Sequence, residues 1–186
     1  MNKLLLLLPL FLSPTVFANE HQVFTEQSQA AIKEFAGTLK GSLVAAMKSG
    51  GPIEAITVCN QVAPTIASEL SKKYGFDIAR TSLKVRNPNN TADTWEQEIL
   101  HQFEASKQQG EDVKTLFVSE AMTKAGNHEM RMMKAIPTAQ VCLTCHGSNI
   151  EPTVQAKLSE LYPGDQATGY SLGDIRGAFT LRKTID

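Results

Sequence analysis

The chain contains one short motif with the residue types and spacing to attach a cofactor covalently. In CLTCH, residues 142–146, two thiols lie three residues apart and an imidazole follows the second. Residues three apart share one side of a helical turn, so Cys142 and Cys145 can form thioethers with two vinyl groups of one haem. The adjacent His146 can then bind the iron as its proximal ligand. The motif therefore predicts one covalent c-type haem.

Three other interpretations of this motif have less support. A thioredoxin-like redox pair normally begins a helix within a βαβ unit, and no such unit is evident. A zinc site needs four ligands, and three cysteines and four histidines supply no second cysteine–histidine pair. A structural disulfide across this spacing is rare. We therefore favour haem attachment.

The N-terminus contains the export pattern that this chemistry requires. A basic residue precedes an apolar run over residues 4–12, and small residues follow up to Ala18. This predicts a signal peptide over residues 1–18 and a single haem domain over residues 19–186, located in the periplasm. The run is shorter than the roughly 20 residues of a membrane span, so we expect no membrane anchor. With 18 basic and 19 acidic residues, we expect no nucleic-acid binding.

The third cysteine, Cys59, has no disulfide partner once the motif is used. It lies on an apolar helix face whose members are Ile56, Cys59, Ala63, Ile66 and Leu70. Pro64 cannot bond the carbonyl of Asn60, so the helix should kink beside Cys59 and make room for a bulky group. On spacing alone, a buried inert thiol and an iron ligand both remain open.

Other side chains compete for the sixth iron position or for the haem propionates. The remaining candidate ligands are Met130, Met132, Met133, His21, His101 and His128. We expect the methionines in the core and His101 at the surface. Guanidinium groups bind carboxylates in a bidentate way, which makes Arg80, Arg86, Arg131 and Arg176 candidates for the propionates. Arg86 and Arg176 are preferred because both lie near predicted turns, whereas Asp165 and Asp174 follow glycines and are expected to be turn residues.

Helices are predicted early in the chain and strands cluster later. Apolar periodicity predicts helices over about 20–48, 52–74 and 93–110, and short helices around 141–147 and 154–161. Extended segments are expected at 76–88, 113–119 and 128–136, followed by two C-terminal strands joined at Gly173-Asp174. This order predicts an α+β domain with an antiparallel sheet.

Four blocks, taken in order, resemble a known family. They are AITVCNQVAPTIA at 55–67, RTSLKVRNPNNTADTWE at 80–96, CLTCHG at 142–147 and YPGDQATGYSLGDIRGAFTLR at 162–182. The family comprises single-haem c-type proteins with a PAS-like fold, long catalogued as a domain of unknown function. The resemblance implies a PAS-like antiparallel sheet flanked by helices, with a long N-terminal helical region. It also implies a haem attached through Cys142 and Cys145, with His146 and Cys59 as axial ligands.

The residues and the resemblance together predict a redox or small-ligand sensor with a His/Cys-ligated haem. Because no output domain is evident, such a sensor would need a redox or signalling partner protein. A periplasmic electron-transfer cytochrome c is the alternative. No nucleophile–base pair or phosphate loop is evident, and a filled sixth position leaves no open iron site for peroxide, so we do not expect an enzyme.

Overall fold

The structure, a computed structural model, describes residues 14–124 and 127–185. The predicted signal peptide lies outside the described residues except for residues 14–18, which begin the first helix, and it stays a prediction. In chain order the elements are α1 Pro14–Ser49, α2 Gly51–Thr57, the π-helical turn η1 Val58–Val62, α3 Ala63–Tyr74, β1 Asp77–Thr81, the 3-10 turn η2 Pro88–Asn90, α4 Thr94–Gln108, β2 Phe117–Lys124, β3 Asn127–Pro137, the 3-10 turn η3 Gln140–Cys142, α5 Leu143–His146, α6 Pro152–Leu161 and β4 Ile175–Ile185.

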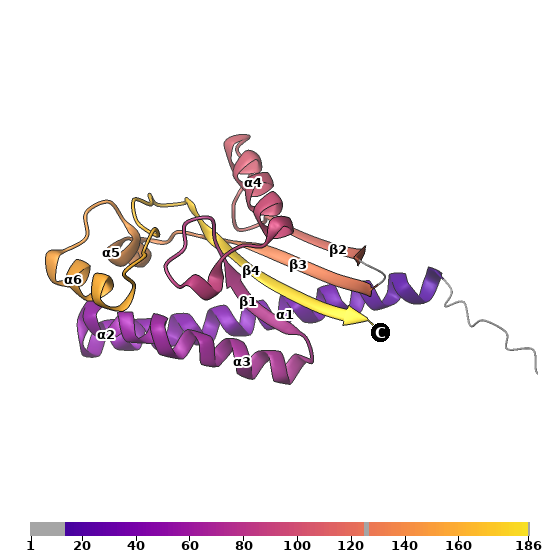
Figure 1. The fold of residues 1–186 in the computed structure, drawn as a ribbon, viewed down its shortest axis with the longest axis horizontal. Helices are drawn as coiled ribbons and strands as arrows, with labels where there is room; N and C mark the ends of the chain where they lie inside the picture. Colours follow the sequence, from indigo (N-terminus) through magenta and orange to yellow (C-terminus); the bar gives the residue numbers. More distant parts are fainter. Residues whose placement is uncertain (1–13, 125–126, 186) are drawn as a thin grey trace, which may run out of the picture.

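A four-stranded sheet forms the centre of the domain. Its strand order is β1-β4-β3-β2, and each neighbouring pair runs antiparallel. The helices α1, α2 and α3 lie together along one side of it, and α4 lies on the other (Figure 1). This confirms the predicted α+β fold, with an antiparallel sheet flanked by helices and a long N-terminal helical region.

Both faces of the sheet are buried, which explains why four successive residues of β3, Met130 to Met133, are all buried. Met130 and Met132 pack with Phe35 of α1 and Leu70 of α3. Met133 points to the opposite face and packs with residues of α4. The predicted core positions of the methionines are therefore confirmed. Within the described part of the chain, no helix combines the length and apolar character needed to cross a bilayer.

The helix α4 begins as its sequence predicts. Asp93 accepts a hydrogen bond from the backbone of Glu96, whose side chain accepts one from the backbone of Asp93, which forms a capping box. Glu96 is also buried against the sheet, where it bonds Arg131 and Thr180. Arg131 is thus committed to the sheet and to α4.

The C-terminal segment differs from its prediction. We expected two strands joined at Gly173-Asp174, but there is one strand, Ile175–Ile185, preceded by a loop. The loop backbone is bonded elsewhere: the N–H groups of Gly169 and Tyr170 donate to the carbonyls of Gly147 and His146. Backbone N–H groups that bond the haem-motif segment cannot also bond a neighbouring strand. The alternation of side chains therefore wrongly predicted a strand here.

The other extended segments are shorter than predicted. The 76–88 segment is a strand only to Thr81, after which Ser82 forms an isolated bridge with Thr91. The strand predicted from residue 113 begins at Phe117. Before β2, residues 112–116 form a hydrogen-bonded turn instead.

A β-bulge in β4 shapes the end of the sheet that faces α5. Ile136 pairs with Gly177, whereas the next residue, Pro137, pairs with Ile175, so Arg176 is an extra residue in its strand. A bulge redirects a side chain out of the regular alternation of a strand. Gly177 has a φ of +152°, and a Cβ placed there would overlap the carbonyl oxygen of Thr81 in the adjacent strand. The close approach of β1 and β4 beside Arg176 therefore requires glycine.

We predict that Gly177→Ala destabilises the protein by about 1–3 kcal/mol, because the added methyl group forces β1 and β4 apart at this point. Urea denaturation followed by circular dichroism measures the change. Gly37 provides the matched control, since it lies in α1 and no side chain or neighbouring segment comes within 4 Å of the place its Cβ would occupy. Gly37→Ala should instead stabilise by about 0.5–1 kcal/mol. Equal midpoints for Gly177→Ala and the unchanged protein would contradict this account.

Candidate functional site

A largely apolar cavity lies where α2, α5 and α6 meet one end of the sheet. The centre of a water molecule has about 200 Å³ of space within it, compared with roughly 10–15 Å³ for a site that holds one water. Apolar residues from α1, α2, β3 and α6 form much of the wall. Every predicted site residue also lines it: Cys59, Arg86, Cys142, Cys145, His146 and Arg176.

The haem motif occupies two short turns rather than one regular helix. Residues Gln140–Cys142 form a 3-10 turn, and Leu143–His146 form the single turn α5. Cys142 and Cys145 carry free, partly buried thiols. Cys145 packs beside the cluster formed by Ile56 and Leu158, so α2 and α6 support the motif from one side. The segment is helical as predicted, but as a 3-10 turn followed by one α-helical turn rather than as a single helix.

Cys59 lies in a distorted part of the predicted second helix. Residues Val58–Val62 form a π-helical turn, in which the N–H of Ala63 donates to the carbonyl of Val58. Pro64, in the first turn of α3, has no N–H with which to continue the α-helical pattern. The distortion predicted from Pro64 is present, and it takes the form of an added residue in the helix turn. Cys59 lines the cavity at this point.

His146 is held in one tautomer by the loop opposite it. Its Nδ1 lies 2.7 Å from the carbonyl oxygen of Ala167, and only an N–H can donate to that oxygen. Nε2 is therefore left with its lone pair. Burial lowers the pKa of His146 to about 2, and the positive charges of Arg176 and Arg86 act in the same direction. The imidazole stays neutral at ordinary pH, which is the form that binds a metal ion.

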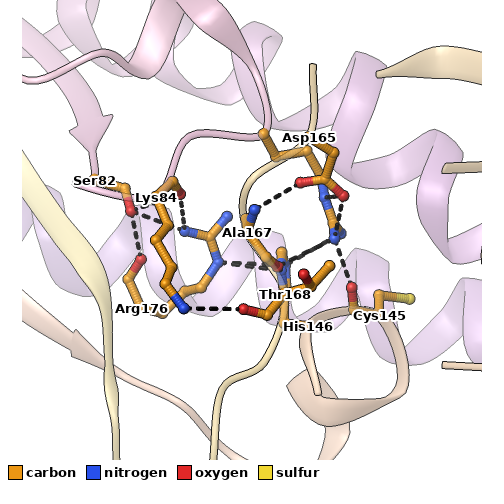
Figure 2. Close-up of polar contacts among 9 residues, drawn as sticks. Ser82, Lys84, Cys145, His146, Asp165, Ala167, Thr168 and Arg176 are labelled. Atoms are coloured by element: carbon orange, nitrogen blue, oxygen red, sulfur yellow. Dashed lines mark hydrogen bonds and ion pairs between the residues drawn. The ribbon is translucent and has the colours of Figure 1, made fainter. Parts of the chain in front are cut away.

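Arg176 reaches His146 from the bulge in β4. Its Nε lies 3.2 Å from Nδ1 and 3.4 Å from Nε2 of the imidazole. Since Nδ1 donates its proton to Ala167, Nε2 is the atom able to accept from Arg176. A second guanidinium nitrogen donates to the hydroxyl of Ser82 at 3.1 Å (Figure 2). The sequence prediction placed Arg176 near the site, and the structure brings it into contact with the motif histidine.

Arg86 is anchored more extensively than the sequence suggested. It forms an ion pair with Asp165 at 2.8 Å, and both side chains are under a tenth exposed. It also donates to the carbonyl oxygens of Cys145 at 2.6 Å and Ala167 at 3.3 Å. Its remaining nitrogen lies 3.5 Å from Nε2 of His146. Arg86 therefore ties the motif segment to the opposite loop, and most of its donors are engaged within the protein.

Asp165 was expected to be a simple turn residue, and its burial in this ion pair goes beyond that expectation. Its other oxygen accepts a hydrogen bond from the backbone N–H of Ala167 at 2.8 Å. Asp174 does have a turn role, because it accepts from the backbone N–H of Ser171 and pairs with Lys107. The sequence showed only that Asp165 falls within a block shared with a family; its ion-pair partner, Arg86, lies 79 positions away in the chain.

The cavity has an excess of positive charge. Arg80, Arg86 and Arg176 line it, and its described lining contains no carboxylate. Asp165 balances Arg86, which leaves Arg80 and Arg176. Burial lowers the pKa of the Arg80 and Arg176 guanidinium groups, so an anion beside them would be favoured. Burial raises the pKa of the Cys59 thiol, whereas the positive charges of Arg80, Arg86 and Arg176 lower it.

The alternative ligands lie away from the cavity lining. Met130, Met132 and Met133 are in the core, and His101 is exposed as predicted. His21 lies in α1 and bonds Ser119 at 2.9 Å. His128 contacts Thr123 at the far end of β3. Of the candidates for the sixth position, Cys59 alone appears among the described lining residues.

Comparisons with known proteins bear on the fold and on the family of the chain. No curated protein matches the chain. The crystal structure of the cyanobacterial haem protein Tll0287 superimposes with a TM-score of 0.63, at 20% sequence identity, covering 91% of this chain and 95% of that chain. This likeness supports the fold. Because the profile of the Tll0287-like family matches residues 15–183, the chain belongs to the Tll0287-like family.

Proposed function

We propose that this chain is a mono-haem c-type protein that acts in the periplasm as a redox or small-ligand sensor. The observation that carries the proposal is the convergence of two thiols, a neutral imidazole and a third thiol on one apolar cavity. The Tll0287 of the matching crystal structure is described as a haem protein. The periplasmic location rests on the predicted signal peptide.

The cavity fits a haem in its chemistry. Cys142 and Cys145 would form the thioethers, and Nε2 of His146 would bind the iron on the proximal side. The two uncompensated arginines, Arg80 and Arg176, match the two carboxylates of a haem. Arg86 is less suited to a propionate than predicted, because Asp165 and two carbonyls already take most of its donors. Bound there, the haem would supply a one-electron redox couple.

Cys59 makes sensing the favoured role. A thiolate is anionic and a strong donor, so it stabilises ferric iron. Burial disfavours the thiolate and raises the pKa of Cys59. With a haem bound, Cys59 would hold the ferric iron as a thiolate, and its raised pKa would favour the protonated thiol once the positive charge beside it falls on reduction. A residue whose bond to iron depends on oxidation state can open a site for a small ligand and signal to a partner protein.

We predict that the protein retains one haem after denaturation when it is produced with a bacterial haem-c attachment system. Cys142→Ala/Cys145→Ala should lose the covalently held haem, because no thioether can form. Cys59→Ala is the matched control, and it should keep the covalent haem since its sulfur forms no thioether. Absorption spectra and intact mass of the denatured proteins measure both. Release of all haem from the unchanged protein on denaturation would refute covalent attachment.

We predict that Cys59→Ser changes the ferric absorption spectrum and raises the midpoint potential. Loss of a thiolate removes the donor that favours ferric iron, and a tenfold change in the equilibrium corresponds to about 59 mV for one electron. Spectroscopic redox titration measures the shift. His101→Ala, at an exposed position on α4, serves as the control and should leave the potential unchanged. An unchanged spectrum and potential in Cys59→Ser would rule out thiolate ligation.

A carbon monoxide titration separates the sensor from the electron carrier. If Cys59 leaves the iron on reduction, the reduced protein should bind carbon monoxide with a clear spectral change. The ferric protein should show none and provides the baseline, because carbon monoxide binds ferrous rather than ferric haem. A reduced protein that keeps its low-spin six-coordinate spectrum and refuses carbon monoxide would contradict the sensor proposal and support electron transfer.

A further inference from the structure

The loop from Tyr162 to Tyr170 is bonded closely to the haem-motif segment. Along it, the N–H of Tyr170 donates to the carbonyl of His146 at 2.9 Å, and the N–H of Gly169 donates to that of Gly147 at 3.1 Å. In the other direction, Nδ1 of His146 donates to the carbonyl of Ala167. The position of the imidazole therefore depends on the position of this loop.

Asp165 is the charged side chain at the centre of these contacts. One of its carboxylate oxygens accepts from Nε of Arg86 at 3.0 Å and is paired with the second terminal nitrogen at 2.8 Å. The other oxygen accepts from the N–H of Ala167 at 2.8 Å. Arg86 donates in turn to the Ala167 carbonyl at 3.3 Å. Both sides of Ala167 are thus fixed by the Asp165–Arg86 pair, and Figure 2 shows the contact between Asp165 and Ala167.

We propose that Asp165 is a positioning residue for the iron ligand: it fixes Ala167, and the Ala167 carbonyl holds the His146 imidazole in the orientation and tautomer that present Nε2 to the iron. This inference rests on the proposed haem function. A hydrogen bond to the far nitrogen of a ligating histidine sets the ring orientation and raises its basicity. Asp165 acts one step further out, through the backbone of Ala167.

Stability alone does not account for this pair. Buried ion pairs often contribute little net stability, because desolvation offsets their attraction. Asp165 instead directs one oxygen to Arg86 and the other to the backbone N–H of Ala167. The carbonyl of Ala167 then accepts from both Arg86 and Nδ1 of His146. A carboxylate is required for this, because an amide has one oxygen and can satisfy only one of the two partners.

The test compares Asp165→Asn and Asp165→Glu with the unchanged haem-loaded protein. In Asp165→Asn the amide group either repels Arg86 or loses the Ala167 N–H, so the imidazole is no longer held in one orientation. The ferric electron paramagnetic resonance signal should broaden. The midpoint potential should rise by about 59 mV, a tenfold change in the equilibrium, as ligand basicity falls and a negative charge is lost.

Asp165→Glu keeps the charge but displaces the carboxylate by one methylene. It should therefore broaden the resonance signal with a smaller change in potential, which separates position from charge. If Asp165→Asn does not accumulate as folded protein, Asp165→Glu alone decides the question. Asp77→Asn is the control for charge loss. Asp77, on β1, forms an exposed ion pair with Arg182 of β4, and loss of the Asp77 charge should leave both readouts unchanged.

The outcomes distinguish this inference from the proposed function. An unchanged protein that takes up no haem overturns both. A haem-loaded protein whose resonance signal is the same in the unchanged form and in both Asp165 variants overturns the positioning role and leaves haem binding intact. A potential shift of the same size in Asp77→Asn would show that net charge, rather than position, is responsible, and would also overturn it.

Discussion

The hydrogen bond from Nδ1 of His146 to the carbonyl of Ala167 is the contact on which the site depends. The motif segment has only single helical turns of its own and cannot hold an imidazole in place. A loop that is separated from it by α6 supplies the missing constraint through its backbone. That loop is fixed by Asp165 and Arg86, and Arg86 comes from the segment after β1. Three segments that are distant from one another in the sequence therefore determine the direction of the Nε2 lone pair of His146.

The sheet and the cavity share a single boundary. At the end of the sheet beside the cavity, β4 contains an extra residue. The side chain of Arg176 is therefore directed to the imidazole of His146 instead of following the alternation of the strand. Gly177 permits β1 to approach closely at the same point. The packing that completes the core thus also places a positive charge against the cavity. Under the proposed function, the two propionates of a haem would offset the cost of burying that charge.

Sequence reasoning identified the residues whose roles follow from spacings of a few positions in the chain. The motif residues, the inward direction of Cys59 and the distortion near Pro64 all follow from patterns within a few residues. The start of α4 near residue 93 was likewise predicted from a local pattern. The roles of Asp165 and Ala167 depend on contacts with residues up to about eighty positions away, and no local pattern encodes these. The same contacts explain why the segment before β4 is a loop although it alternates like a strand.

The π-helical turn at Cys59 has a consequence for how the sequence can change length. It adds one residue to a continuous helical run, and each residue in an α-helix turns the face by about 100°. On one side Ile56 packs against α6, and on the other Ile66 and Leu70 pack against the sheet. Deleting a single residue here would restore a regular helix but rotate one of these faces away from its partner. The turn therefore fixes the number of residues between two buried surfaces, and insertions or deletions in evolution should be confined to the loops outside it.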